Sequence, residues 1–428
     1  MKKIYANGTD EAAFLSDLAK RSGETNKKVT EVVTGIIENV RENGDQAVKD
    51  YTLKFDGHLP QYYEVPRDVI NDALTEADQE FVDALLNAQA NIADFHSRQV
   101  EQSFINAKDN GVIMGQRIRG LERVGLYVPG GTAAYPSSVL MNAIPAKIAG
   151  VKEIIMVTPP LKDGTPNKDI LVAAAICGVD RWFISCGGQE IAALDFGTVE
   201  IRKCDMIVGR GNLFVGSSKK LLYGVVDIDM KAGPSEILVI ADDTADPKFA
   251  AADLMSQAEH DVLASAIMVT TSEKLADATL AEIERQKQYL SRKDIISKSL
   301  EDYGAIIIAD SREKCVELAN RIAPEHLEVL MENPFELLGS LDNAGSIFLG
   351  NYASEPLGDY YAGPNHVLPT SGTARFFSPL GVASFTKRTA YTYYTEDALR
   401  QAKDDIVLIA EREGLTAHAN AIKVRFEN

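Results

Sequence analysis

The sequence predicts an α/β fold: two successive doubly wound, incomplete Rossmann-like units, with helical segments at both ends of the chain. Two patterns lead to this prediction. From about residue 121, short apolar runs alternate with stretches of helical periodicity, as expected for parallel strands joined by crossover helices. The same alternation then occurs a second time, between residues 237 and 349.

Residues 1 to about 110 are predicted to be helical, because apolar residues such as Val29, Val33 and Ile36 recur at steps of three and four. In the first unit, the predicted strands are 124–128, 153–157, 181–184, 206–208 and 225–228, with helices at 137–149 and 169–177. In the second unit, the predicted strands are 237–241, 266–269, 305–309 and 346–349, with helices at 247–260, 273–288 and 311–322.

The last hundred residues contain two further features. The segment 350–379 is rich in Gly, Pro, Asn, Asp and Ser, and it is long for a connection without secondary structure. Connections of that length inside compact domains are usually functional. The tail from residue 396 returns to a helical pattern, with a predicted break at Gly414.

Composition narrows the class of protein. The 428 residues include 44 Lys and Arg against 62 Asp and Glu, a formal net charge of -18, which argues against binding nucleic acid through its phosphates. No apolar stretch is long enough to span a membrane, and the N-terminus lacks the apolar core of a signal peptide. The four cysteines, Cys177, Cys186, Cys204 and Cys315, are too irregularly spaced for a zinc knuckle and suit a reducing compartment. We therefore expect a cytoplasmic protein.

Common nucleotide fingerprints are absent. The chain contains no G-x-G-x-x-G, no P-loop and no G-x-S-x-G. Glycines nevertheless gather where predicted strands end and helices begin, at positions 125, 130, 131, 187, 188, 209 and 211. Such glycines either let a phosphate approach the backbone or simply allow a tight turn.

Polar side chains suited to a metal come from three separate segments. Gln257 and His260 lie three residues apart at the end of a predicted helix, Asp359 lies in the Gly- and Pro-rich segment, and His418 follows Gly414. Imidazole and carboxylate ligands from separate segments are typical of a catalytic zinc site, although glutamine is an uncommon ligand. The alternative is that each histidine is only a hydrogen-bonded core or surface residue.

Glu325 and His326 form a second candidate pair. They follow Pro324, which favours a loop or a helix start, so we expect both side chains to be exposed there. A carboxylate beside an imidazole offers two proton-transfer groups with different pKa values. An N-terminal helical turn in which Glu325 interacts with the helix dipole is an equally good interpretation.

Six motifs in the same order together resemble the L-histidinol dehydrogenase family. They are GLYVPGG (125–131), AGPSE (232–236), SQAEH (256–260), APEHLE (323–328), SEPLGDYYAGPNHVLPT (354–370) and EGLTAH (413–418). The resemblance covers nearly the whole chain. It implies NAD-dependent oxidation of L-histidinol to L-histidine through the bound aldehyde, the last step of histidine biosynthesis.

The resemblance also implies a role for each matching residue. One Zn²⁺ per subunit would be bound by Gln257, His260, Asp359 and His418, and Glu325 and His326 would be the acid/base residues. Ser235, His326, His366 and Glu413, together with the zinc ligands, would contact the substrate, and Tyr127, Gln189 and Asn212 would contact NAD. The family forms a homodimer whose C-terminal segment reaches the partner's active site.

By the same resemblance the chain divides into four parts. These are an N-terminal helical segment, 1–26; a larger α/β domain, 27–126 plus 237–381, with most of the metal and catalytic site; a second α/β domain on the NAD side, 127–236; and a helical tail exchanged with the dimer partner, 382–428.

Three positions depart from the family pattern: Glu190, Arg210 (where we expect proline) and Lys231. All three bear on the NAD side and not on the metal site. Two other functions remain open, a zinc hydrolase and a related zinc/NAD alcohol dehydrogenase for another small amino alcohol or diol. A hydrolase would turn over without NAD, and a binding protein that only keeps the fold would not turn over at all.

Overall fold

The computed structural model describes residues 1–21, 27–130, 134–185, 187–230 and 233–427. The chain forms two units, each described by itself: a large one, Met1–Gln99 with Leu121–Phe385, and a small one, Val100–Gly120 with Thr386–Asn428. The predicted residues Gly131, Cys186 and Lys231 lie outside the described ranges. Among the described residues, no helix is long and apolar enough to cross a membrane.

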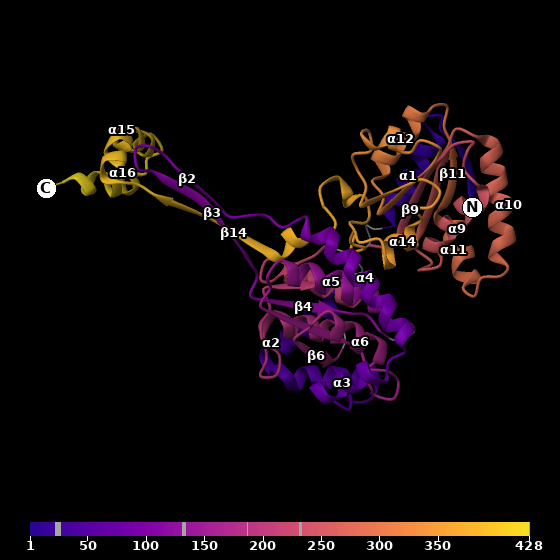
Figure 1. Ribbon diagram of the computed structural model, residues 1–428, viewed down its shortest axis with the longest axis horizontal. Helices are drawn as coiled ribbons and strands as arrows, with labels where there is room; N and C mark the ends of the chain where they lie inside the picture. Colours follow the sequence, from indigo (N-terminus) through magenta and orange to yellow (C-terminus); the bar gives the residue numbers. More distant parts are fainter. Residues whose placement is uncertain (22–26, 131–133, 186, 231–232, 428) are drawn as a thin grey trace. The chain divides into compact units, whose positions relative to one another are not determined.

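The large unit contains two parallel sheets, which confirms the predicted α/β class. The five-stranded sheet has the order β6 (Arg181–Ile184), β5 (Glu153–Thr158), β4 (Arg123–Tyr127), β7 (Met206–Val208) and β8 (Asp227–Ile228). The six-stranded sheet has the order β1 (Lys2–Tyr5), β11 (Gly304–Ile308), β10 (Ser265–Thr270), β9 (Glu236–Ala241), β12 (His326–Leu330) and β13 (Ser346–Leu349). Both are covered by helices on two faces (Figure 1).

The five-stranded sheet is connected by α5 (Pro136–Ile148), α6 (Lys168–Ile176), α7 (Gly188–Phe196) and α8 (Leu213–Leu222). Three earlier helices add to its two cores: α2 (Lys27–Asp56) packs with α7 and α8, whereas α3 (Arg67–Glu76) and α4 (Gln79–Ser97) pack with α6 and α5. The domain boundaries given above stay a prediction, although the helices of residues 27–97 pack on this sheet.

On the six-stranded sheet, one core lies under α9 (Pro247–Ala258), α10 (Glu273–Lys287) and α11 (Lys293–Tyr303). The other lies under α1 (Asp10–Lys20), α12 (Arg312–Ile322) and the short α13 (Phe335–Leu338). The Gly- and Pro-rich segment contains α14 (Glu355–Tyr360) and the 3₁₀ turn η1 (Thr373–Arg375), and a further turn, η2 (Val382–Phe385), follows it.

The prediction of helix throughout residues 1–110 is wrong at two places. β1 occupies Lys2–Tyr5 and pairs in parallel with β11, and β2 occupies Phe104–Ala107. Both strands are short and largely solvent-accessible, so they lack the apolar pattern of a buried strand. β1 pairs with β11, far away in the chain, and β2 pairs with the next strand, β3 (Ile113–Gly120). The spacing of apolar residues within one segment does not predict such pairing.

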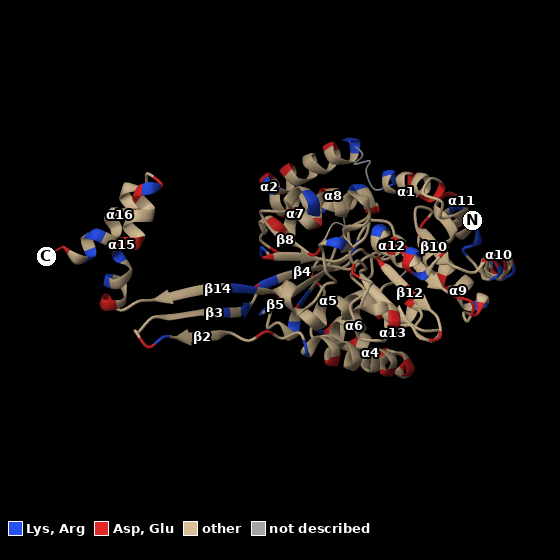
Figure 2. Ribbon diagram, turned by 90° about the horizontal axis from the view of Figure 1, so that it is seen from above, with Lys and Arg blue, Asp and Glu red and all other residues tan. Residues whose placement is uncertain are grey.

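The small unit is an antiparallel sheet of β14 (Thr386–Tyr393), β3 (Ile113–Gly120) and β2, followed by α15 (Glu396–Arg412), α16 (Thr416–Lys423) and the turn η3 (Val424–Phe426). Figure 2 shows acidic and basic residues spread along the ribbons of α15 and α16. The predicted helical tail and its break are confirmed: Gly414 lies between α15 and α16 with φ of 76°. Strands β3 and β14 were not predicted.

Candidate active site

The candidate acid/base pair lies at the amino ends of β9 and β12, two adjacent strands of the six-stranded sheet. His326 is the first residue of β12, Glu325 precedes it, and Glu236 is the first residue of β9. The expectation of exposed side chains after Pro324 is wrong, because Glu325 is 0% and His326 4% exposed. β12 is paired on both sides, by β9 and β13, and this pairing draws its first residue into the interior.

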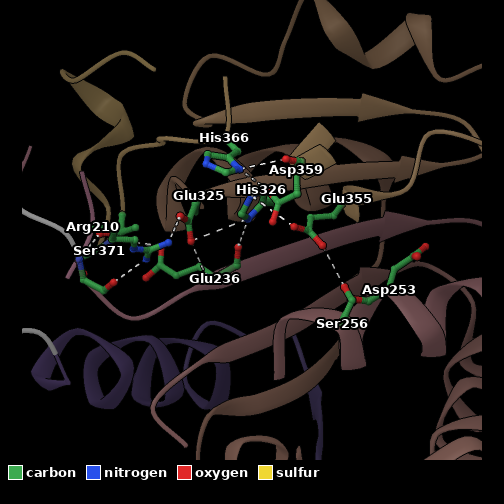
Figure 3. Close-up of polar contacts among 12 residues, drawn as sticks. Arg210, Glu236, Asp253, Ser256, Glu325, His326, Glu355, Asp359, His366 and Ser371 are labelled. Atoms are coloured by element: carbon green, nitrogen blue, oxygen red, sulfur yellow. Dashed lines mark hydrogen bonds and ion pairs between the residues drawn. The ribbon is translucent and has the colours of Figure 1, made fainter. Parts of the chain in front are cut away.

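The backbone of one residue, Glu236, orients both members of the pair (Figure 3). The N–H of Glu236 donates to Glu325 Oε2 at 3.0 Å, and His326 Nδ1 donates to the carbonyl oxygen of Glu236 at 2.9 Å. Because Nδ1 carries the proton, neutral His326 has its lone pair on Nε2. His326 is therefore held as a proton acceptor.

The free nitrogen of His326 faces two carboxyl groups of α14. Nε2 lies 3.8 Å from Glu355 Oε1 and 4.0 Å from Asp359 Oδ1. Nε2 and Glu355 Oε1 are both buried without a hydrogen-bond partner in the part of the chain that the structure describes. Each of the three side chains offers a ligand atom within 4.8 Å of the others, a set of nitrogen and oxygen donors that suits a divalent cation.

The electrostatics of this cluster follow from burial. Burial, and next the charge of Asp359, raise the pKa of Glu355 to about 7. Burial opposes charge on His326, but Glu325, Glu355 and Asp359 outweigh it and raise the pKa of the imidazole above its ordinary value. Burial also raises the pKa of Asp359, so the two neighbouring carboxyl groups favour sharing a proton over carrying two negative charges.

The structure brings two of the four predicted ligands, Gln257 and Asp359, to the same carboxyl group. Gln257, in the last turn of α9, is buried and hydrogen-bonds to the carboxyl group of Glu355, which also binds Asp359. His260 follows in the turn after α9 and is exposed. The predicted helix thus stops at Ala258, before His260.

Other predicted residues lie close by or in the small unit. His366 donates from Nδ1 to the backbone oxygen of Asp359 at 3.0 Å. Ser235 directly precedes β9 and is 9% exposed. Glu413 is the C-cap of α15 and His418 lies on α16, both in the small unit.

A cation from the five-stranded sheet also reaches the pair. Arg210 donates to Glu325 Oε1 at 3.1 Å and to the backbone oxygen of Gly233 at 2.7 Å (Figure 3). The sequence linked Arg210 only to NAD binding. Its contact with Glu325 depends on the loop after β7 and could not be read from the local sequence.

A buried ion pair fixes that loop. Lys219 and Asp229 are 3% and 2% exposed and bind each other. Lys219 Nζ donates to the backbone oxygen of Gly209 at 2.8 Å, and the N–H of Gly209 donates to Asp229 Oδ2 at 2.8 Å. Both the backbone N–H and the backbone oxygen of Gly209 are therefore hydrogen-bonded. This holds the backbone in place directly before Arg210.

The side of the fold predicted to bind NAD lies at a topological switch point. In the order β6-β5-β4-β7-β8 the direction of winding reverses between β4 and β7, and doubly wound sheets bind ligands at that place. Tyr127 ends β4, and Asn212 caps α8 just after β7. Gln189 is fully buried in α7, and neither of its amide atoms has a hydrogen-bond partner among the described residues. These unpaired amide atoms and the open switch point fit a dinucleotide.

The glycines at these strand ends are needed for packing. A Cβ on Gly209, whose φ is 113°, would lie 2.0 Å from the backbone oxygen of Tyr127, and one on Gly211 would lie 2.6 Å from Val215. Gly125 lies inside β4, so the expectation that it follows the strand is wrong. The close packing around Gly209 and Gly211 therefore explains why glycine occupies both positions, without a bound phosphate.

Sequence reasoning missed three buried carboxyl groups, Glu355, Glu328 and Asp253. Glu355 and Asp359 are four residues apart on α14, so they share a face, and both belong to a motif quoted above. That spacing was the available signal. Glu328 ends the quoted motif APEHLE, but neither it nor Asp253 has a spacing that marks it as buried, and acidic residues are ordinarily read as exposed.

A parallel sheet with an open switch point, beside a buried imidazole among carboxylates, defines an α/β enzyme with an acid–base centre. Comparison with known proteins gives the family. The histidinol dehydrogenase family model matches residues 19–426. The chain belongs to the histidinol dehydrogenase family, which confirms the resemblance found in the motifs.

Relatives agree over nearly their whole length. The chain is 57% identical to the histidinol dehydrogenase of Clostridium acetobutylicum over 426 residues, 99% of each chain, and 55% identical to that of Listeria innocua, over 98% of each. The crystal structure of histidinol dehydrogenase from Elizabethkingia anophelis has a TM-score of 0.93 at 38% identity, covering 99% of this chain and 98% of that one.

The buried ion pair behind Arg210 gives a stability prediction. Replacing Lys219→Met leaves Asp229 buried without a partner, which is expected to cost about 3–5 kcal/mol of unfolding free energy. Urea unfolding measures it. The matched control is Lys220→Met, since Lys220 is exposed on the same helix, and its change should stay within about 0.5 kcal/mol. Equal midpoints for the two variants would contradict the prediction.

Proposed function

We propose that this oxidoreductase catalyses the NAD-dependent four-electron oxidation of L-histidinol to L-histidine through bound L-histidinaldehyde, the last step of histidine biosynthesis. Family membership over nearly the whole chain supports the reaction. The observation that carries the chemistry is the orientation of His326: its Nδ1 is committed to the Glu236 carbonyl, and its Nε2 is a buried, unpaired acceptor among the described residues.

The two oxidations need two proton-transfer groups. In the first, the substrate loses the hydroxyl proton to His326 Nε2 and a hydride from the same carbon. In the second, water adds to the aldehyde as Glu325 takes one of its protons, and the resulting gem-diolate loses another hydride to give the acid. NAD supplies the hydride acceptor in both oxidations, so two NADH leave for each histidine formed.

Zinc is proposed as the resident metal, one ion per subunit, with Gln257, His260, Asp359 and His418 as ligands. The convergence of Gln257 and Asp359 on Glu355 supports two members of this set, and Asp359 also belongs to the donor set around His326. When bound, zinc would supply positive charge and orient the substrate. Its positive charge would also offset the negative charge of the buried carboxyl groups, which otherwise favour holding a proton.

The remaining contacts are proposed from the family motifs. Ser235, His326, His366 and Glu413, with the zinc ligands, would contact the substrate. Tyr127, Gln189 and Asn212 would contact NAD. The switch point between β4 and β7 supports the NAD side. The side chain of Asn212 already accepts from the N–H groups of Phe214 and Val215, so it would position the α8 terminus beside the cofactor.

A homodimer with a shared active site is proposed as the working form, in the cytoplasm. The small unit carries Glu413 and His418, and it exposes large apolar side chains that a second copy would cover, including Phe104 (56%), Ile105 (66%), Tyr393 (57%), Leu408 (56%) and Ile409 (60%). Several large apolar side chains exposed on one small unit favour a protein–protein interface there. The free, buried Cys177, Cys204 and Cys315 suit a reducing compartment.

The proposed reaction is tested by its stoichiometry. Purified protein with added Zn²⁺, L-histidinol and NAD should form about two NADH per histidine, measured by NADH absorbance and by quantifying histidine. A strong chelator should abolish the signal, and Zn²⁺ should restore it. Hydrolysis of an ester or amide without NAD would favour a zinc hydrolase, and NADH formed only from another amino alcohol or diol would favour a related dehydrogenase.

Substituting Glu325→Gln separates the two oxidations. The variant should slow the oxidation of L-histidinaldehyde by about 10²–10⁴-fold, because general-base activation of water is lost. The oxidation of histidinol to aldehyde should fall less, because His326 remains. Single-turnover kinetics started from each substrate measure this ratio. Equal losses in both steps would assign Glu325 another role.

Complementation tests the shared site. His326→Ala and His418→Ala alter the large and the small unit respectively, and each should be inactive alone. When the two are unfolded and refolded together, random pairing should restore about a quarter of wild-type activity, because half the dimers are mixed and each mixed dimer has one intact site. No recovery, with mixed dimers shown by mass spectrometry, would place His326 and His418 of one chain in the same site.

A further inference from the structure

Glu328 is a carboxyl group that the proposed chemistry does not use, yet it is completely buried at 0% exposure. It lies on β12, two residues after His326, so the two side chains project from the same face of the sheet. That face packs against α9, whereas Leu327 and Val329 belong to the core on the opposite face.

Two hydrogen bonds hold the Glu328 carboxyl. Its Oε1 accepts from the N–H of Glu355 at 2.7 Å, at the start of α14. Its side chain is also hydrogen-bonded to the carboxyl group of Asp253 on α9. Oε2 meets no N–H or hydroxyl donor among the described residues, so the bond to Asp253 requires a proton between the two carboxyl groups.

The electrostatics favour that proton on Glu328. Burial and the nearby carboxyl of Asp253 raise the pKa of Glu328 well above its ordinary value. Burial also raises the pKa of Asp253, to about 6, but the hydrogen bond from Glu328 lowers it. Whichever of the two carboxyl groups carries the shared proton, Glu328 binds α14 through Oε1 and is joined to Asp253 on α9.

These bonds join the three elements that carry the site. β12 carries His326, α9 carries Gln257 in its last turn, and α14 carries Glu355 and Asp359. Ser256 adds a second link between α9 and α14, since its Oγ is 2.8 Å from the backbone oxygen of Asp253 and 3.2 Å from Glu355 Oε2 (Figure 3).

We infer that Glu328 is a positioning residue, which sets the spacing of Gln257, Glu355 and Asp359 and so the affinity of the site for a divalent cation. This inference rests on the proposed function. Glu328 contacts the backbone of Glu355 and the side chain of Asp253, and neither is a proposed zinc ligand. Residues that orient metal ligands commonly change affinity by about 10–100-fold when replaced.

The hydrogen-bond pattern makes glutamine the conservative replacement. In Glu328→Gln, the amide oxygen can accept from the Glu355 N–H, and the amide NH₂ can donate to Asp253. In Glu328→Leu, the volume is similar, but both bonds are lost and Asp253 loses its donor. The two variants thus separate the hydrogen bonds from the space that the side chain fills.

The experiment measures the zinc dissociation constant of the full-length protein by competition with a chromophoric chelator. Glu328→Gln should bind zinc within about twofold of wild type, and Glu328→Leu about 10–100-fold more weakly. Melting temperatures of the zinc-free proteins report any general loss of stability. Glu332→Leu is the matched control, an exposed carboxyl just after the same strand, and should bind like wild type.

Wild-type affinity in Glu328→Leu, or equal loss in Glu328→Gln and Glu328→Leu, overturns the inference. If Glu328→Leu does not fold, Asp253→Asn and Asp253→Leu decide in its place: Asn should keep the affinity, Leu should weaken it, and equal affinity overturns the inference. If the wild-type protein forms NADH from histidinol but does not bind zinc, the inference is overturned and the proposed function is not. Zinc binding with the expected ranking but no NADH from histidinol overturns the proposed function alone.

Discussion

The site depends on the backbone of one residue, Glu236. Its N–H binds Glu325 and its carbonyl binds His326, so the separation and orientation of the acid/base pair are set by backbone atoms at the start of a central strand. The side chain of Glu236 is itself anchored, by Arg21 and by the N–H of Ser371 at 3.1 Å. Backbone atoms in a paired strand cannot change rotamer, which makes them a firmer support than a side chain.

The second constraint is the cost of burying carboxyl groups together. Glu325, Glu328 and Glu355 are all buried, and each is satisfied differently: by Arg210, by a retained proton shared toward Asp253, and by a proton shared with Asp359. A buried charge without a partner is strongly unfavourable, so the cluster folds in a partly neutral form. A divalent cation replacing that proton would bind where the protein has already placed its ligands.

The two sheets contribute opposite strand ends to the site. The six-stranded sheet offers the amino ends of β9 and β12, and the five-stranded sheet offers the loop at the carboxyl end of β7, from which Arg210 reaches Glu325. The ordinary rule that ligands bind at carboxyl ends of parallel strands thus holds only for the five-stranded sheet. The acid/base pair lies at the amino ends of its own strands, where the crossover connections end.

Sequence alone determined the α/β class, most strands of both sheets and the helical tail. The spacing of apolar residues and the glycines and prolines that end each element are local properties, so each segment shows them by itself. Ordered motifs then determined the family and named Glu325 and His326. Tertiary structure decided the rest: that β1 is a strand, that Glu325 and His326 are buried, that Arg210 binds Glu325, and that Glu328 joins α9 to α14. Each of these depends on a partner between about 27 and 300 residues away, and burial and pairing across such distances arise only when the chain has folded.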